Sequence, residues 1–463
     1  MVDSYMEDPM NSIRHFVHEG LGNSSYLVEV GSTEAIIIDP DRTAGRYLES
    51  AEDKGLKIVG ALETHVHADF VTGAIEVATA TGAKIYNPGG SGSRYAHHPL
   101  AGGDAVRIGE ATIETIAAPG HTPEHVAYLV RLPGEEPMLF SGGSMIVGGA
   151  ARTDLLRPEQ RDPLSRAQYH TLREAFAHLH DSTLLYPTHG GGSFCSAGSG
   201  DGRSSTLGEQ RTMNPALREM TEDEFVDWFP TTFPNVPKYY WKMRQINQAG
   251  PRLRRDIAMP KEFEPQHFED AGKRGIIVDV RTPEEHLRGH IPGSLANPFR
   301  EVFGVWIGWL VDLGTPLAFV ADGQPLDRVV DECLLVGHEE LVAVLDGGFV
   351  AWEGAGMPVA SDPYLAPAEA CKKITDGVAV LDVREPDEWE RARIEGAIHI
   401  PLGDLQGRID DVPRNRPVLA YCGAGERSTS AVSILERAGV DTVMSIRGGF
   451  SAWENAGEPV ERG

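Results

Sequence analysis

The chain has 463 residues, of which 41% are hydrophobic and 24% are charged, and its formal net charge is −26. This length is too great for one hydrophobic core, and the composition is that of an ordinary globular protein, so we expect about three domains. The acidic charge excludes nucleic acid and anionic membrane as partners, because surfaces that bind phosphate need clustered Lys and Arg.

The cysteines and the first residues indicate a reducing compartment. Cys195, Cys333, Cys371 and Cys422 are too few for a disulfide framework in a chain of this length. Residues 1–11 are acidic and lack the layout of a signal peptide, and no apolar run is long enough to span a bilayer. We therefore expect a cytoplasmic protein with free thiols.

The first 255 residues are predicted to form a layered α/β domain. The β-branched runs 35–39 and 57–62 end in polar or Gly-rich turns, which is typical of strands. Helical patterns follow at 75–81 and 165–178, and the Gly/Ser-rich stretch 190–205 indicates a loop. We place the first domain at residues 1–255, with a linker continuing to about Pro265.

Histidines follow three separate apolar stretches of this domain. His65 and His67 come directly after the strand that ends at Leu62, and alternate positions of an extended segment point the same way. His121 and His189 each lie in a Gly/Pro-flanked turn after an apolar run. Because strand-end histidines of an α/β layer can meet in one cleft, the pattern predicts a metal site.

These motifs resemble those of the metallo-β-lactamase fold, and more narrowly those of persulfide dioxygenases, over roughly residues 12–255. The resemblance depends on the runs Glu63–Asp69, Arg152–Asp154 and Asn214–Leu217. It implies an αββα sandwich and one ferrous iron held by two His and one Asp. By position, His65 and His121 would be the two histidine ligands.

Two positions depart from the family pattern. Gly143 stands where the family has its Asp ligand, and Phe70 stands where the wider fold has another histidine. Two neutral imidazoles without an anionic ligand hold Fe²⁺ weakly. Asp69, with His67 or His189, is a candidate to complete the site. The expected cofactor is Fe²⁺ or Zn²⁺, and the alternative is that no metal is bound.

Cys195 lies in the Gly-rich loop after His189. It is either a thiol that relays a persulfide near the cleft or a loop cysteine without a role, and both interpretations stay open at this point. Cys333 and Cys371 have no motif around them, and we assign them no function.

A pattern of roughly 100 residues occurs twice after the first domain. Each copy has a buried strand, a Pro-acidic helix start, a second strand and a helix, which predicts a parallel sheet covered on both faces. We place the two copies at residues 266–360 and 363–463. The paired positions are Asp279–Arg281 with Asp382–Arg384, Gly347–Phe349 with Gly448–Phe450, and Trp352 with Trp453.

Only the second copy holds a thiol at the end of its central strand: Cys422 aligns with Val320 of the first copy. The residues that follow are Gly423, Ala424, Gly425, Glu426 and Arg427. Glycines allow successive N–H groups to point at the sulfur, and a helix expected to begin near residue 428 adds its dipole. The motif therefore favours a thiolate or persulfide at Cys422.

This loop, the Asp-Val-Arg strand and the closing Gly-Gly-Phe…Trp resemble a single-domain rhodanese, a sulfurtransferase that carries sulfur as a cysteine persulfide. The resemblance implies that Cys422 is the nucleophile, that residues 423–426 form the cradle and that Arg427 stabilises charge. Related phosphatases have Cys-x5-Arg, whereas here Arg427 comes one position sooner, so the cradle suits one sulfur atom better than phosphate. With Val320 and Pro325, the first copy resembles a rhodanese without its nucleophile.

The whole chain resembles a three-domain class of persulfide-oxidising proteins: an α/β protein with a metallo-β-lactamase sandwich followed by two doubly wound rhodanese-like domains. The expected substrates are a low-molecular-weight thiol persulfide, thiosulfate or sulfite, and we expect a homo-oligomer. One alternative makes the first domain a non-catalytic module that binds the persulfide carrier. Another is a thioester hydrolase like glyoxalase II, which needs two metals.

Overall fold

The computed structural model describes residues 5–7, 12–197, 200 and 202–463 of the chain. These residues form two compact units, one up to Ile257 together with residues 334–337, and the other from Ala258 onward without them. None of the helices within the described ranges is both long and apolar enough to cross a lipid bilayer.

Two mixed sheets form the centre of the first unit. The strands of the first sheet are β1 (Tyr5–Glu7), β2 (Ile13–His18), β3 (Asn23–Glu29), β4 (Glu34–Ile38), β5 (Lys57–Leu62), β6 (Lys84–Pro88) and β7 (His98–Leu100), in that order. Those of the second sheet run in the order β15 (Ser205–Thr206), β13 (Leu184–Pro187), β11 (Met138–Gly142), β10 (Val126–Arg131), β9 (Ala111–Ala117) and β8 (Ala105–Ile108). A short pair, β12 (Ala150–Ala151) and β14 (Ser196–Ala197), lies beside them.

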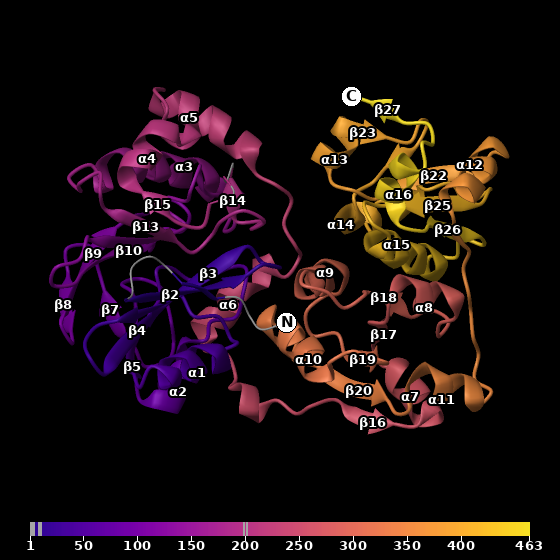
Figure 1. Ribbon diagram of the computed structural model, residues 1–463, viewed down its shortest axis with the longest axis horizontal. Helices are drawn as coiled ribbons and strands as arrows, with labels where there is room; N and C mark the ends of the chain where they lie inside the picture. The colour runs from indigo at the N-terminus through magenta and orange to yellow at the C-terminus, as the bar shows by residue number, and fades with distance from the viewer. Residues whose placement is uncertain (1–4, 8–11, 198–199, 201) are drawn as a thin grey trace. The chain divides into compact units, whose positions relative to one another are not determined.

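Helices cover the outer face of each sheet. They are α1 (Gly45–Asp53), α2 (Ala74–Thr81), α3 (Arg161–His170), α4 (Leu207–Met213), α5 (Glu222–Trp228) and α6 (Tyr240–Ala249). Within this unit, α1 and α2 lie on one side of the two sheets, and α3, α4 and α5 on the other (Figure 1). The helix expected at 165–178 ends at His170 and continues only as a π-helical turn, Thr171–Ala175.

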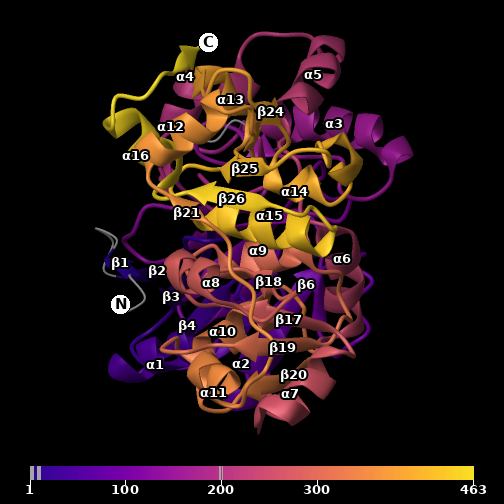
Figure 2. The ribbon, with the colours of Figure 1, turned by 90° about the vertical axis from the view of Figure 1, so that its right-hand side faces the viewer.

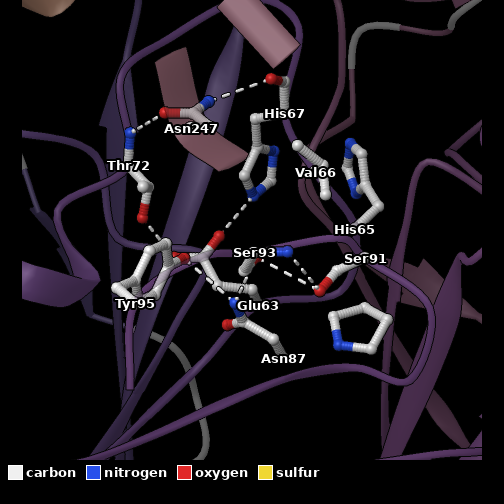
Figure 3. Close-up of a pocket in the computed structure, with 11 residues that line it drawn as sticks. Glu63, His65, Val66, His67, Thr72, Asn87, Ser91, Ser93, Tyr95 and Asn247 are labelled. Carbon is white, nitrogen blue, oxygen red and sulfur yellow. Dashed lines mark hydrogen bonds and ion pairs between the residues drawn. The ribbon is translucent and has the colours of Figure 1, made fainter. Parts of the chain in front are cut away.

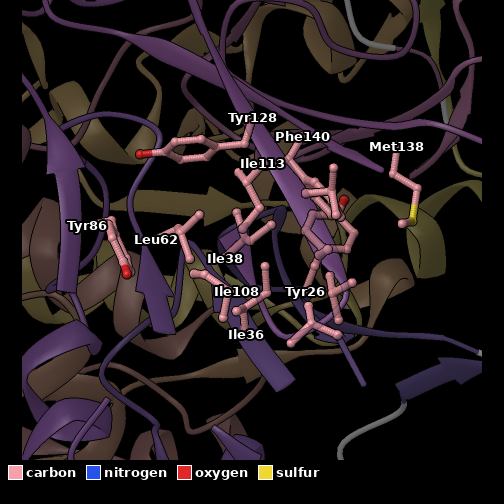
Figure 4. Close-up of a cluster of buried hydrophobic side chains, with 14 of the residues drawn as sticks. Tyr26, Ile36, Ile38, Leu62, Tyr86, Ile108, Ile113, Tyr128, Met138 and Phe140 are labelled. Carbon is pink, nitrogen blue, oxygen red and sulfur yellow. The ribbon is translucent and has the colours of Figure 1, made fainter. Parts of the chain in front are cut away.

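The alternation of side chains along the strands builds this sandwich. Ile36 and Ile38 of β4 point inward to the same core cluster as Ile113 and Tyr128 of the second sheet (Figure 4). Ile37, one residue out of phase, packs on the other face with α1 and α2. The period of two therefore divides each strand between two hydrophobic layers. The αββα sandwich expected from the sequence is confirmed.

The second unit contains two parallel five-stranded sheets, one for each copy of the repeat. The first has the order β16 (Lys261–Phe263), β20 (Leu341–Leu345), β19 (Leu317–Val320), β17 (Ile276–Asp279) and β18 (Leu295–Ala296). The second has the order β21 (Tyr364–Leu365), β26 (Val443–Ile446), β25 (Val418–Tyr421), β22 (Ala379–Asp382) and β24 (Ile398–His399). The two copies therefore share one topology, as the repeated pattern predicts.

Helices connect these strands in both copies. The first copy has α7 (Pro265–Gly272), α8 (Pro283–Arg288), α9 (Phe303–Leu310), α10 (Leu326–Leu335) and α11 (Gly348–Gly354). The second has α12 (Pro367–Thr375), α13 (Pro386–Arg391), α14 (Leu402–Leu405), α15 (Glu426–Arg437) and α16 (Gly449–Asn455). A final pair, β23 (Ala392–Arg393) and β27 (Glu461–Arg462), joins the C-terminal residues to α13.

The repeated Asp-Val-Arg motif is a structural ion pair in each copy. Arg281 lies 2.6 Å from Asp279 and 4.1 Å from the ring centre of Phe349. The equivalent Arg384 lies 2.6 Å from Asp382 and packs on its own Gly-Gly-Phe ring in the same way. The repeated residues therefore serve the fold of both copies.

The two copies pack directly on each other inside the second unit. Helix α15, which begins at the thiol loop, lies against β18 and α8 of the first copy (Figure 2). His290 lies 2.9 Å from Glu436, and the Ala296 amide donates to the Ser433 hydroxyl at 3.0 Å. Arg437 donates to the Gly293 carbonyl at 2.7 Å. These contacts hold the C-terminal half of α15 against the first copy.

Candidate functional site

The thiol of Cys422 lies where β25 ends and α15 begins, and its residue is only 1% exposed. The amide of Gly425 donates to its sulfur at 3.1 Å, and Ser428 Oγ lies 3.6 Å from the same atom. Gly425 has φ +117°, which turns the chain so that α15 starts at Glu426, slightly earlier than the sequence indicates. An amide donor and a helix N-terminus both stabilise negative charge on sulfur.

Arg427, the last residue of this loop motif, is held by a carboxylate. Its two Nη atoms lie 2.7 and 2.8 Å from the oxygens of Glu388 in a bidentate pair. Burial opposes the charge of Arg427, but Glu388 outweighs it and raises the pKa of the guanidinium. The family resemblance assigns the positive charge of Arg427 to catalysis, but the negative charge of Glu388 already offsets much of it.

The Gly-Gly-Phe motif supports the thiol loop from below. Phe450 N donates to the Cys422 carbonyl at 2.7 Å. Gly449, the residue before Phe450, has φ +59°. A Cβ atom at Gly449 would come within 2.4 Å of the Cys422 carbonyl oxygen. Only glycine fits this position, because the conformation is left-handed and the space is filled by backbone.

We expect Gly449→Ala to destabilise the thiol-bearing copy by about 3 kcal/mol or more, because it adds a backbone clash to the left-handed strain. Gly457→Ala is the matched control: its φ is +75° but no atom lies within 4 Å of an added Cβ. It should cost only about 1 kcal/mol. Hydrogen exchange of peptides around Cys422 measures both, and equal protection in the two variants would contradict the packing argument.

The first copy has no equivalent of this thiol. Its Val320 lies at the end of β19, and the Asp322 carboxylate accepts the hydrogen bond of Phe349 N at 2.7 Å. In the second copy the equivalent amide, Phe450 N, donates to the Cys422 carbonyl. A side-chain carboxylate of the first copy therefore replaces a backbone acceptor of the second. No nucleophile is present at this position.

In the first unit, His65, His121 and His189 lie together: one ring nitrogen of each falls within 4.8 Å of the others. All three residues are at most 1% exposed. His65 follows β5, His189 follows β13, and His121 lies in the turn between β9 and β10. The convergence of these three elements is as the sequence predicts.

The hydrogen bonds fix which nitrogen of each ring faces the centre. The Thr64 hydroxyl donates to Asp39 at 2.7 Å, so it accepts from His65 Nδ1 at 2.9 Å. His121 Nδ1 donates to the Arg152 carbonyl at 2.6 Å, and His189 Nδ1 donates to the Asn23 side-chain oxygen at 2.9 Å. Each Nδ1 therefore carries the hydrogen, and each Nε2 presents a lone pair.

These lone pairs form a site that fits one divalent metal ion. His65 Nε2 and His189 Nε2 face each other at 3.3 Å, and His121 Nε2 is buried without a partner among the described residues. Burial lowers the pKa of His121 to about 3, so its ring stays neutral. Three neutral imidazoles with their lone pairs on one centre are the donors of a histidine-bound transition metal.

His67 is not part of this donor set. Its Nε2 lies 3.0 Å from Glu63 and 3.3 Å from Asp39, as the close-up shows for Glu63 (Figure 3). Burial alone would lower the pKa of His67, but these carboxylates raise it to about 10. Phe70 stacks on the ring at 4.3 Å. The cavity lined by Glu63, His65 and His67 has a volume of only about 10 Å³.

Asp69 lies behind His189, and its Oδ1 atom is buried without a hydrogen-bond partner among the described residues. Its Oδ2 accepts from Asn23 at 2.6 Å and lies 3.3 Å from His189 Nδ1. Burial opposes its ionisation, but His189 and Asn23 hold the pKa of Asp69 below its ordinary value. A carboxylate behind a ligating imidazole orients the ring and raises its basicity. Asp69, His67 and His189 also offer ligand atoms within 4.8 Å of one another, so Asp69 stays a candidate for the missing carboxylate.

The turn at Gly143 has no room for the aspartate of the family pattern. A Cβ there would lie 2.8 Å from the His121 ring and 2.9 Å from Ala151. Gly143 N donates to His125 Nε2 at 2.9 Å, and His125 stacks on His65 with ring centres 4.8 Å apart. His125 was not singled out from the sequence, although its i+4 spacing from His121 was the available signal.

Cys195, in the Gly-rich loop after His189, is fully buried. Burial and the charge of Asp69 raise the pKa of its thiol well above the ordinary value. A neutral, inaccessible thiol is a poor nucleophile, so its position does not support a relay of persulfide.

Comparison with known proteins agrees with this architecture. The family model described as the metallo-beta-lactamase superfamily matches residues 18–189, and that of the rhodanese-like domain matches residues 264–355 and 366–456. The human mitochondrial persulfide dioxygenase ETHE1 is 32% identical over 222 residues, which are 48% of this chain and 78% of that protein. This chain belongs to the persulfide dioxygenase family.

Two further likenesses extend beyond the dioxygenase part. A sulfurtransferase of Allochromatium vinosum is 34% identical over 86 residues, 19% of this chain and 80% of that protein. A crystal structure of a metallo-beta-lactamase from Staphylococcus aureus subsp. aureus COL aligns with a TM-score of 0.65 and 28% identity. It covers 72% of this chain and 98% of that one. This member of the persulfide dioxygenase family thus carries two rhodanese-like domains after its metallo-β-lactamase domain.

Proposed function

We propose that this chain is an enzyme of sulfane-sulfur metabolism in which Cys422 carries sulfur as a persulfide. The observation that supports the transfer reaction best is the Gly425 amide 3.1 Å from the Cys422 sulfur, at the start of α15. Donor and dipole stabilise the thiolate that attacks and the persulfide anion that results.

Sulfur transfer takes place in two steps. The Cys422 thiolate attacks the outer sulfur of thiosulfate, a new S–S bond forms, and sulfite leaves with the electron pair of the broken S–S bond. The Cys422 persulfide then gives its outer sulfur to cyanide or a thiolate, and the Cys422 thiolate is restored. The reverse of the first step joins the outer sulfur of the persulfide to sulfite and yields thiosulfate.

The test uses the full chain and thiosulfate labelled in its outer sulfur. We expect label to remain covalently on the protein after the excess thiosulfate is removed, and to appear in thiocyanate once cyanide is added. A protein that acquires no label, and forms no labelled thiocyanate, would contradict the proposal.

For the first domain we propose persulfide dioxygenation, with His65, His121 and His189 holding one iron ion. A bound iron would supply the single-electron chemistry that a reaction between O₂ and a persulfide requires. Hydrogen bonds to Nδ1 orient the three imidazoles, and Asp69 places one negative charge behind His189. In balance, one thiol persulfide, one O₂ and one water give one thiol, one sulfite and two protons.

Oxygen uptake separates this proposal from a non-catalytic module that binds the persulfide carrier. With glutathione persulfide as substrate, an oxygenase consumes one O₂ for each sulfite that it forms, whereas a carrier module consumes none. We expect O₂ uptake that scales with the iron content of the preparation. Absence of uptake in iron-loaded protein would favour the binding module.

The thioester hydrolase alternative is not supported by the geometry. It needs a second metal, and His67 is paired with Glu63 and Asp39 while Phe70 stacks on its ring. A protonated imidazole offers no lone pair to a metal ion. We therefore propose that this chain binds a single metal and acts on thiosulfate, sulfite and thiol persulfides.

A further inference from the structure

The cleft above the thiol loop is built by both copies of the repeat. It has a volume of about 450 Å³. The second copy contributes its loop residues and Ser451, and the first copy contributes Arg300, Val302 and Trp306. The copy that lacks a nucleophile therefore forms one wall of the site in which the nucleophile of the other copy would act.

Arg300 is the unusual member of this wall. It is half-buried, and its Nη1 atom is buried without a hydrogen-bond partner among the residues that the structure describes. A guanidinium has five N–H donors and keeps its charge, so a buried donor without a partner is costly. An anion in the cleft would remove this cost.

Arg427, the other cation of the cleft, is less available to bind an anion. Both Nη atoms of Arg427 are held by Glu388 at 2.7 and 2.8 Å. Glu426 also lines the cleft. Burial lowers the pKa of Arg300, while Glu426 and Cys422 act to raise it, which places Arg300 within electrostatic reach of the thiol.

The segment that carries Arg300 is fixed to the second copy on both sides. Before it, the Ala296 amide donates to Ser433 of α15 at 3.0 Å. After it, the Leu310 carbonyl accepts from Gln406 at 2.9 Å, and a Cβ at Gly403 would come within 2.6 Å of the Trp309 ring. These contacts fix the segment that carries Arg300 on the second copy, and Arg300 lines the cleft beside the thiol loop.

We propose that Arg300 of the nucleophile-free copy binds the sulfur oxyanion, thiosulfate or sulfite, that reacts at Cys422. This inference rests on the proposed sulfurtransferase function and names the residue that selects its doubly charged substrate. The bond changes remain those of the transfer reaction, and Arg300 takes no proton: its N–H groups bind the oxygens of the sulfonate end. It also gives the first copy a role that does not require a thiol.

The test compares Arg300→Gln and Arg300→Lys in the full chain with two sulfur donors. For Arg300→Gln we expect the KM for thiosulfate to rise roughly ten- to a hundredfold, as for a lost charge-assisted hydrogen bond, with a smaller change in kcat. Arg300→Lys should recover part of the affinity, since it keeps the charge. Loading of Cys422 from the persulfide of 2-mercaptoethanol, which lacks a sulfonate group, should change less than threefold.

Arg288→Gln is the matched control, because Arg288 belongs to the same copy and its side chain is 72% exposed. It should leave both donors unaffected. A thiosulfate KM within twofold of wild type in Arg300→Gln would overturn the inference, and so would equal losses with both donors. Either result leaves the sulfurtransferase proposal intact as long as Cys422 still acquires labelled sulfur; absence of label in the unaltered protein would overturn both.

Discussion

Replacement of Cys422 with Ser is expected to reduce thiosulfate:cyanide transfer by at least about a thousandfold. A serine hydroxyl is not ionised at neutral pH and cannot hold a sulfane sulfur, so the persulfide intermediate cannot form. The change is nearly isosteric, and the Gly425 amide would still have a hydrogen-bond acceptor. The loss would therefore reflect chemistry and not an altered fold.

Cys371→Ser is the control for this experiment. Cys371 lies on α12 in the same copy, is only partly buried and has no glycine loop around it. It should retain wild-type turnover and labelling. If Cys422→Ser keeps a tenth or more of the activity, or if label appears on Cys371, then the assignment of the nucleophile is wrong.

Replacement of His121 with Ala is expected to lower the bound metal content of the purified protein by at least about tenfold. The substitution removes one of the three imidazoles whose ligand atoms lie within 4.8 Å of one another. Metal analysis by mass spectrometry after dialysis measures the effect without depending on activity. The wild-type chain should retain close to one metal ion per chain.

His178→Ala provides the comparison, because His178 is exposed in the same unit. It should keep wild-type metal content.

Gly143→Asp tests whether the site can accept the carboxylate of the family pattern. It restores the carboxylate of the family pattern, yet a Cβ at this position lies 2.8 Å from the His121 ring. We expect it to bind no more metal than wild type. A gain of metal in Gly143→Asp, or full retention in His121→Ala, would contradict the three-histidine site.

Much of this architecture could be predicted from the sequence. The strands 57–62 and 418–421, the Cys422 loop and the repeated Gly-Gly-Phe are local patterns. Period-two burial, glycine at positive φ and strand-to-helix turns depend on neighbouring residues only, so the order of amino acids suffices. The repeat also showed that one copy had lost its thiol, because Val320 aligns with Cys422.

The partners of these residues come from distant parts of the chain, and only the tertiary structure decided them. Asp69 lies in the loop after β5 and His189 directly follows β13, and Asn23 joins them: its side chain donates to Asp69 and accepts from His189. The guanidinium of Arg427 forms an ion pair with Glu388. Arg300 of the other copy keeps a buried N–H donor that has no hydrogen-bond partner among the described residues. Pairings of this kind depend on how separate elements pack, which local patterns do not encode.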